Sequence, residues 1–163
     1  MTFKNYTIRP ATVADAAILA HHRTEMWLAM NYLKPHAAQQ MRELSVGYFE
    51  NAIPKKDFIG WVVENASNIV VAGGGLSLRL TPPMPDANGE TLPTSYTAHV
   101  FNIFVEPTHR KQGLARFVMQ TIDNWCKEND IHTLTLNASA EGQPLYESMG
   151  YKVIKNFMRL NRK

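Results

Sequence analysis

The chain has 163 residues, of which 45% are hydrophobic and 19% are charged, and its 17 basic and 14 acidic residues give a formal net charge of +3. This length suits a single domain over 1–163, and the composition excludes a disordered chain. The charge is too small and too dispersed for a nucleic-acid-binding surface, so we expect no nucleic-acid partner.

Two further features bear on where the protein works. No apolar run approaches the roughly 20 residues that a membrane-spanning helix needs, and the N-terminal stretch lacks the apolar core of a secretory signal. Cys126 is the single cysteine, which excludes an internal disulfide and fits a reducing compartment. We therefore expect a cytoplasmic protein with no membrane contact.

The N-terminal third predicts one strand followed by two helices. Residues 6–10 (YTIRP) have the composition of a strand that ends at its proline. Thr12 and Asp15 form a capping-box pattern, which begins a helix that reaches about Met30. A second helix is expected over about 37–51.

The middle of the chain predicts strands. Residues 58–65 and 69–80 read as a hairpin, and the three consecutive glycines in its second strand indicate a bulge or a close backbone approach. The proline-rich stretch 81–95 predicts a long loop. The apolar run 97–105 is typical of a strand that is buried on both faces.

The C-terminal part predicts an amphipathic helix over 112–129, a strand over 131–137, a short helix over 141–149 closed by Gly150, and one or two strands over 151–161. The complete order is β-α-α-β-β-β-α-β-α-β. It predicts the α/β class, with a mixed central sheet flanked by helices.

The segment with the clearest chemical meaning is NIFVEPTHRKQGLARFVMQ (102–120). A strand ends at Val105, and a loop containing Gly113 leads directly into a helix. Such a loop aims consecutive backbone N–H groups at one point, where the helix dipole also favours an anion. The local cations Arg110, Lys111 and Arg116 supply counter-charge, although neither the P-loop nor the dinucleotide-binding pattern is present.

Two blocks of the sequence resemble the GNAT N-acetyltransferase superfamily. Arg110-x-x-Gly113-x-Ala115, just after a strand, is similar to the family's Q/R-x-x-G-x-G/A pyrophosphate motif. Residues 134–153 are similar to its block of a strand, an asparagine, a helix carrying a tyrosine and a glycine–aromatic pair. The order of elements also matches, so the resemblance implies the GNAT fold and acetyl-CoA as co-substrate.

The resemblance also implies how coenzyme A is held. Strands 97–105 and 131–137 would splay apart around the pantetheine arm, which pairs with main-chain groups of Ile103 and Val105. Asn137 and Ser139 could hydrogen-bond the same arm. The pyrophosphate would lie on the loop and the helix start formed by Arg110, Lys111, Gln112, Gly113, Leu114, Ala115 and Arg116.

The catalytic roles implied by the resemblance fall to two residues. Tyr146 matches the family's helix tyrosine and would protonate the departing thiolate; the alternative is a core aromatic that packs the short helix. His99 lies where some family members place a catalytic glutamate, and an imidazole can accept a proton near neutral pH. The alternative for His99 is a hydrogen-bonded structural histidine.

Other polar residues are weaker candidates. Strand alternation predicts that Asn102 points to the face opposite His99, where it lines the site or satisfies a backbone group. Glu106 is a second base candidate at the strand end, and a chain of waters could replace any base. Tyr32 and His36 are candidate acceptor contacts.

Several residues fit structural roles better. The histidines show no metal-ligand spacing, so we expect no metal. Cys126 is expected to be a buried small hydrophobe rather than a nucleophile. Met26, Trp27 and Met30 are more typical of a core, although the first two helices would border an acceptor pocket.

These observations predict an acetyl-CoA-dependent N-acetyltransferase that acts on the primary amine of a small molecule. A protein N-terminus or lysine is an alternative acceptor, and a non-catalytic acyl-CoA sensor is the alternative from a different class. A homodimer rests only on the general frequency of such assemblies.

Overall fold

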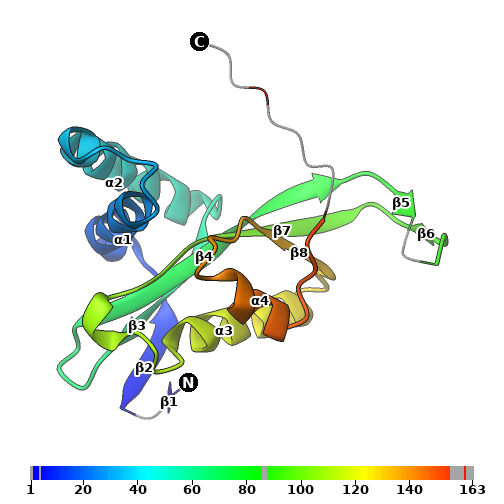
Figure 1. The fold of residues 1–163 in the computed structure, drawn as a ribbon. Helices are drawn as coiled ribbons and strands as arrows, with labels where there is room; N and C mark the ends of the chain where they lie inside the picture. The colour runs from blue at the N-terminus through cyan, green and yellow to red at the C-terminus, as the bar shows by residue number, and fades with distance from the viewer. Residues whose placement is uncertain (1, 4, 86–87, 155–159, 161–163) are drawn as a thin grey trace.

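The computed structural model describes residues 2–3, 5–85, 88–154 and 160. Within them, a six-stranded sheet with the order β1-β2-β3-β4-β7-β8 separates two helical layers (Figure 1). Its strands are β1 (Thr2–Phe3), β2 (Tyr6–Pro10), β3 (Ile59–Glu64), β4 (Val70–Thr81), β7 (Ser95–Val105) and β8 (Thr133–Leu136). The helices are α1 (Ala16–Ala29), α2 (Ala38–Lys55), α3 (Leu114–Glu128) and α4 (Gln143–Ser148).

The helices cover opposite faces of the sheet, with α1 and α2 on one side and α3 and α4 on the other (Figure 1). All neighbouring strands of the large sheet are antiparallel except β7 and β8, which are parallel. The expected mixed sheet flanked by helices is confirmed. β1 was not expected, and it adds two residues at the edge beside β2.

Each face of the sheet has its own apolar core. The core under α3 is dominated by the stripe that the amphipathic pattern predicts, and it includes Cys126, whose thiol pKa burial raises to about 11. The core under α1 and α2 is smaller and aromatic-rich, and its buried members are Ala16, Leu19, Ala20, Phe49, Ala52, Phe58 and Val62.

The start of α1 is tied to the sheet by charge. The Thr12 backbone N–H donates to Asp15 Oδ2 at 2.7 Å, which is one half of the predicted capping box. The Arg9 guanidinium of β2 donates to both carboxylate oxygens of Asp15, at 2.8 and 2.9 Å. These donors lower the pKa of the Asp15 carboxyl even though burial opposes them. The contacts set where α1 begins relative to the sheet.

The predicted loop over 81–95 is wrong in part. β4 and β7 extend into it from both sides, and β5 (Met84–Pro85) pairs with β6 (Thr91–Leu92) beyond them. The hairpin therefore forms an arm that projects past the helical layers (Figure 1). Its prolines are tolerated because short, exposed strands leave some backbone N–H positions unpaired.

Two other boundaries differ from the sequence prediction. α2 runs four residues beyond 51, to Lys55, because Ala52 still packs on the sheet, and the helix ends where Lys56 adopts a φ of +60°. The strands expected over 151–161 are not seen in 151–154, which have no regular structure. Of the remainder, only Leu160 lies within the described residues.

Candidate functional site

The two parallel strands separate along the second half of β7. β8 pairs with β7 only from Thr97 to Val100. From Phe101 to Val105, β7 keeps its antiparallel pairing with β4 on the other side, but β8 does not continue beside it. The β7 edge that faces β8 is therefore open to a ligand over these residues.

A bulge lies where this open edge begins. The register between β4 and β7 shifts opposite Gly74, and Asn102 adopts a left-handed φ of +60°, which asparagine tolerates better than most residues. An added Cβ on Gly74 would lie 3.1 Å from the Cα of Ile103, so the glycine permits this close approach.

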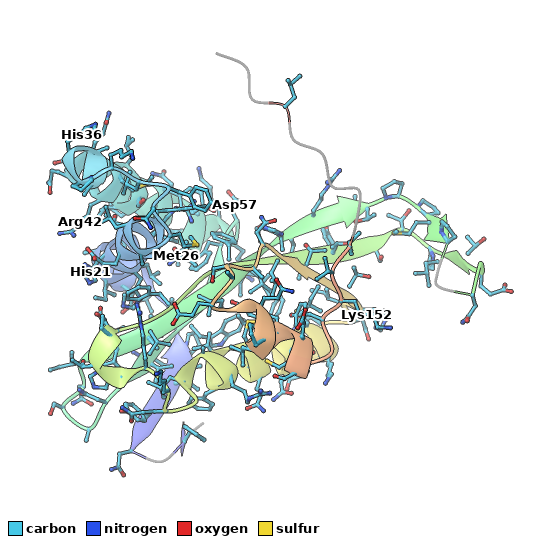
Figure 2. All side chains as sticks on the ribbon, in the orientation of Figure 1. His21, Met26, His36, Arg42, Asp57 and Lys152 are labelled. Atoms are coloured by element: carbon cyan, nitrogen blue, oxygen red, sulfur yellow. The ribbon has the colours of Figure 1, made fainter. Side chains whose placement is uncertain are left out.

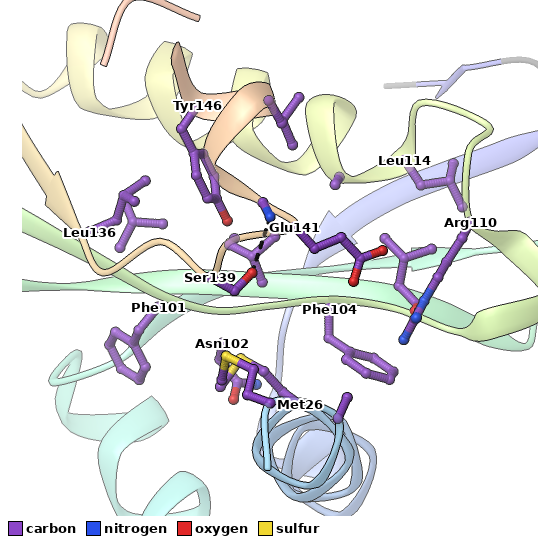
Figure 3. Close-up of a pocket in the computed structure, with 18 of the residues that line it drawn as sticks. Met26, Phe101, Asn102, Phe104, Arg110, Leu114, Leu136, Ser139, Glu141 and Tyr146 are labelled. Carbon is purple, nitrogen blue, oxygen red and sulfur yellow. Dashed lines mark hydrogen bonds between the residues drawn. The ribbon is translucent and has the colours of Figure 1, made fainter. Parts of the chain in front are cut away.

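The bulge overturns the prediction that Asn102 faces away from His99. Phe101 and Asn102 follow one another on the same side of the sheet, pointing toward α1 (Figure 3). Asn102 Nδ2 donates to the Leu19 carbonyl of α1 at 3.2 Å, and the His99 ring stacks on Phe101 with 6.3 Å between centroids. Simple alternation fails here because a bulge adds one residue to the strand.

The loop before α3 has the conformation of an anion site. Gly113 is the residue before the first helical turn and has a φ of +89°, which few other residues can adopt. The first N–H groups of a helix have no intrahelical partner, so those of 114–116 are available to an anion.

The nearby cations hold defined positions. Arg110 Nε donates to the Val105 carbonyl at 3.1 Å, and its guanidinium lies 5.7 Å from the centroid of the Phe104 ring. Arg116 donates to Ser148 Oγ of α4 at 2.6 Å. These contacts keep positive charge beside the start of α3.

A cavity of about 780 Å³ runs from this loop, along the open edge of β7, to α1. Figure 3 shows α4 and the segment after β8 on one side of it and α1 on the other. Tyr146, His99 and every predicted cofactor-binding residue except Gln112 line this cavity. Gln112 Oε1 instead accepts a hydrogen bond from the Tyr6 hydroxyl at 2.9 Å.

Tyr146 projects from α4 with its hydroxyl toward the cavity (Figure 3). Its ring packs edge-on against Tyr151 at 5.9 Å between centroids. Burial raises the pKa of the Tyr146 phenol, so it carries its proton at neutral pH. Ser139 Oγ accepts the Gly142 N–H at 3.1 Å and fixes the turn into α4.

His99 is held by the neighbouring strand. Its Nδ1 atom lies 3.0 Å from Thr135 Oγ1, and the same hydroxyl lies 3.3 Å from the Ala98 carbonyl. When Thr135 donates to Ala98, His99 Nδ1 is the donor to Thr135 and the ring's lone pair lies on Nε2. Burial lowers the pKa of His99, which keeps the ring neutral at physiological pH.

Glu106 does not line the large cavity. Its carboxylate contacts the His21 Nε2 atom of α1 at 3.1 Å. It also lies 3.4 Å from His22 Nε2, but neither ring nitrogen of His22 has a hydrogen-bond partner among the described residues. Glu106 thus joins the end of β7 to α1, which is a structural position.

The buried imidazole of His22 gives a prediction for stability. Burial lowers the pKa of His22 from 6.5 to about 3, so between these values the unfolded chain binds a proton that the folded chain does not. The free energy of unfolding is therefore unaffected by protonation of His22 above pH 6.5 and decreases as the pH falls, by about 2 kcal/mol at pH 5. Urea denaturation at several pH values should show that the difference in the free energy of unfolding between wild type and His22→Gln becomes smaller on acidification.

The matched control is His132→Gln, because this histidine is exposed just before β8. Its stability curve should run parallel to that of the wild type. If the difference in the free energy of unfolding between wild type and His22→Gln stays constant from pH 7 to pH 4.5, the folded protein does not hold His22 as a buried neutral imidazole.

One face of α1 supplies cavity residues that the sequence prediction placed mainly in the core. Arg23, Met26, Trp27 and Met30 all line the cavity. Their spacing of three, four and seven residues puts them on one side of a helix, which is the signal that could have identified them. Met26 lies on the side of α1 that faces the sheet (Figure 2).

The two predicted acceptor contacts between the helices lie elsewhere. Tyr32 is 78% exposed, and neither it nor His36 lines the cavity. His36 lies at the outer end of the helical pair (Figure 2). Glu141, which was not predicted, does line the cavity, and its carboxyl points toward the Arg110 side (Figure 3).

Among the histidine, cysteine and acidic residues of the described part of the chain, no group of three is placed to hold a metal ion. No helix in that part is both long enough and apolar enough to cross a membrane.

Comparison with known proteins agrees with this geometry. Residues 88–160 match the family model of the acetyltransferase (GNAT) domain. The chain is similar to a GCN5-related N-acetyltransferase from Ralstonia eutropha JMP134, with 23% identity, a TM-score of 0.82 and coverage of 96% of this chain and 98% of that one.

Two other solved structures are similar over nearly their whole length. A predicted acetyltransferase with acetyl-CoA from Clostridium acetobutylicum has 23% identity and a TM-score of 0.78, with 96% of each chain covered. Glucosamine-6-phosphate N-acetyltransferase from Arabidopsis thaliana has 16% identity and a TM-score of 0.64, with 97% of this chain and 99% of that one covered. At these identities the similarity confirms the fold.

Proposed function

From the premise that residues 88–160 belong to the GNAT acetyltransferase family and that the chain has the GNAT fold, we propose that this protein transfers an acetyl group from acetyl-CoA to a primary amine of a small molecule. The observation that carries the proposal is one continuous cavity. It joins the loop at Gly113, the unpaired edge of β7 and the α1 face.

The residues on the wall suit the parts of coenzyme A. The pyrophosphate would lie at the start of α3, where Gly113 allows free N–H groups to converge and Arg110, Lys111 and Arg116 bring positive charge. The pantetheine arm would run along β7, using main-chain groups of Ile103 and Val105 that β8 leaves unpaired. Asn137 and Ser139 border the same path.

The reaction needs a neutral amine, a stabilised oxyanion and a proton for the departing sulfur. The amine nitrogen attacks the thioester carbonyl carbon, a C–N bond forms, and the C–S bond breaks. In the tautomer with the proton on Nδ1, the neutral His99 ring accepts at Nε2 the proton that the nitrogen loses, and it then releases this proton to solvent. Tyr146 supplies a proton to the thiolate and regains one from solvent.

The proposal is tested in two measurements on the intact chain. Calorimetric titration with desulfo-CoA should give a saturable heat, because binding needs only the nucleotide and pantetheine contacts. Release of free thiol from acetyl-CoA with a panel of amines should exceed the rate without amine. No binding would contradict the proposal, and binding without turnover of any amine would favour the non-catalytic sensor.

The base role of His99 predicts a defined pH effect. His99→Gln should lower kcat by roughly 100-fold, the lower end of the usual range for general-base catalysis. It should also remove the fall in rate that wild type shows as the pH drops through the lowered pKa of His99. His132→Gln is the control, and a full rate for His99→Gln across neutral pH would make His99 structural.

A further inference from the structure

The cavity contains a cation that the proposed binding of acetyl-CoA does not use. Arg23 lines the cavity from α1, with its guanidinium 5.7 Å from the Trp27 ring centroid and 5.9 Å from that of Phe101. The cations suited to the pyrophosphate, such as Arg110, lie at the other end, beside the start of α3. Arg23 is therefore on the wall where an acceptor would enter.

This guanidinium has no anionic partner. No carboxylate in the described part of the chain forms an ion pair with Arg23, and the titratable group that faces it is the Tyr48 hydroxyl, a neutral phenol whose pKa burial raises. Two aromatic rings compensate its charge only in part, and burial lowers its pKa, although a guanidinium stays protonated at neutral pH. A half-buried, preoriented and unpaired guanidinium is suited to a planar anion, which it can hold through two parallel hydrogen bonds.

The surroundings of Arg23 restrict the rest of the ligand. Met26, Trp27, Met30 and Phe101 line the same end of the cavity and form an apolar wall. Glu141 is the carboxylate among the described residues on the cavity wall, and it points toward Arg110 rather than toward α1 (Figure 3). A polycationic acceptor would meet Arg23 without a counter-charge, so the charge pattern disfavours polyamines.

Resting on the proposed function, we propose that the acceptor is a small amine that also carries a carboxylate, that Arg23 binds this carboxylate, and that the acceptor's apolar part packs against the α1 wall. The class is that of amino acids with apolar side chains. The transferred acetyl group goes to the amine nitrogen, and the carboxylate remains unchanged.

The test compares matched acceptors at saturating acetyl-CoA. Phenylalanine is paired with phenylalanine amide and with phenethylamine, and methionine with methionine amide. Because loss of the carboxylate also changes the pKa of the amine, kcat/KM is calculated for the neutral amine of each acceptor. We expect kcat/KM of the wild type to be roughly 10- to 100-fold higher for the free acids, the range for a hydrogen-bonded charge pair. β-Alanine and aminoethyl phosphate are compared in a separate arm, and preference for the phosphate would overturn the carboxylate assignment.

Variants then assign the effect to Arg23. Arg23→Gln should remove the preference for the acid over the amide while leaving the affinity for desulfo-CoA unchanged, and Arg23→Lys should retain part of it. Arg79→Gln makes the same charge change at an exposed position outside the cavity and should retain the full preference. Equal kcat/KM for acids and amides in the wild type would overturn the inference. So would a preference that survives in Arg23→Gln, or no turnover of any carboxylated amine.

These outcomes are separable from failure of the proposed function. If desulfo-CoA binds and amines without a carboxylate are acetylated as well as the acids, the proposed acetyl transfer stands and the proposed role of Arg23 is wrong. If desulfo-CoA does not bind, the proposed function itself fails.

Discussion

Replacing Gly113 with valine should weaken binding of desulfo-CoA by at least about 100-fold. Gly113 has a φ of +89°, where a β-branched residue is strongly disfavoured. An added Cβ would also lie 3.3 Å from Cζ of the Phe3 ring, which would have to shift by a few tenths of an ångström. Relief of the strain at this φ would change the conformation of the loop. The free N–H groups at the start of α3 would then turn away from the pyrophosphate, and two lost charge-assisted hydrogen bonds cost about 3–6 kcal/mol.

Calorimetric titration measures this effect, and a matched glycine separates it from simple destabilisation. Gly89 has a φ of +84° with no atoms within 4 Å of an added Cβ, and it lies in the β5–β6 arm outside the cavity. Gly89→Val should suffer similar backbone strain yet bind desulfo-CoA normally. Wild-type affinity in Gly113→Val would mean that the loop does not hold the pyrophosphate.

The second large effect is expected at Tyr146. Tyr146→Phe should lower kcat by roughly 100-fold, as for loss of a general acid, while changing the dissociation constant of desulfo-CoA by less than about threefold. The ring remains, so packing on α4 is kept, and only the proton donor is lost. Stopped-flow or steady-state detection of free thiol, together with calorimetry, separates turnover from binding.

Tyr151 provides the control for this prediction. It packs against the Tyr146 ring, and burial raises its phenol pKa to about 12, but it does not line the cavity. Tyr151→Phe should therefore keep kcat near the wild-type value. If Tyr146→Phe also keeps the wild-type kcat, another group or solvent protonates the sulfur, and Tyr146 serves only to pack α4.

The acceptor end of the site depends on residues that the sequence shows ambiguously. Met26, Trp27 and Met30 share one helical face with Arg23, and such a stripe is as typical of a core as of a cavity. In the structure Leu19 lies on the same helical face and is fully buried, whereas Arg23, Met26 and Met30, further along α1, line the cavity. Only the packing of α1 on the sheet decides which part of this face is buried and which part borders the cavity.

Features that depend on neighbours along the chain could be predicted from the sequence. The period of the apolar residues predicted α3, the Thr12–Asp15 pattern predicted the start of the first helical segment, and the segment around Gly113 predicted a loop that leads directly into a helix. These are local effects of backbone sterics, capping and helix periodicity, and they need no tertiary information.

Tertiary structure decided what depends on contacts between distant segments. The bulge at Asn102 reversed the expected side of that residue, because the register between β4 and β7 is set by pairing across the sheet. The arm formed over 81–95 likewise depends on pairing between segments that are separated along the chain, β4 with β7 and β5 with β6. The β7 edge that lines the cavity is open because β8 stops pairing with β7 at Val100. Where two strands stop pairing depends on how both segments pack in the fold, and the sequence of neither segment shows it by itself.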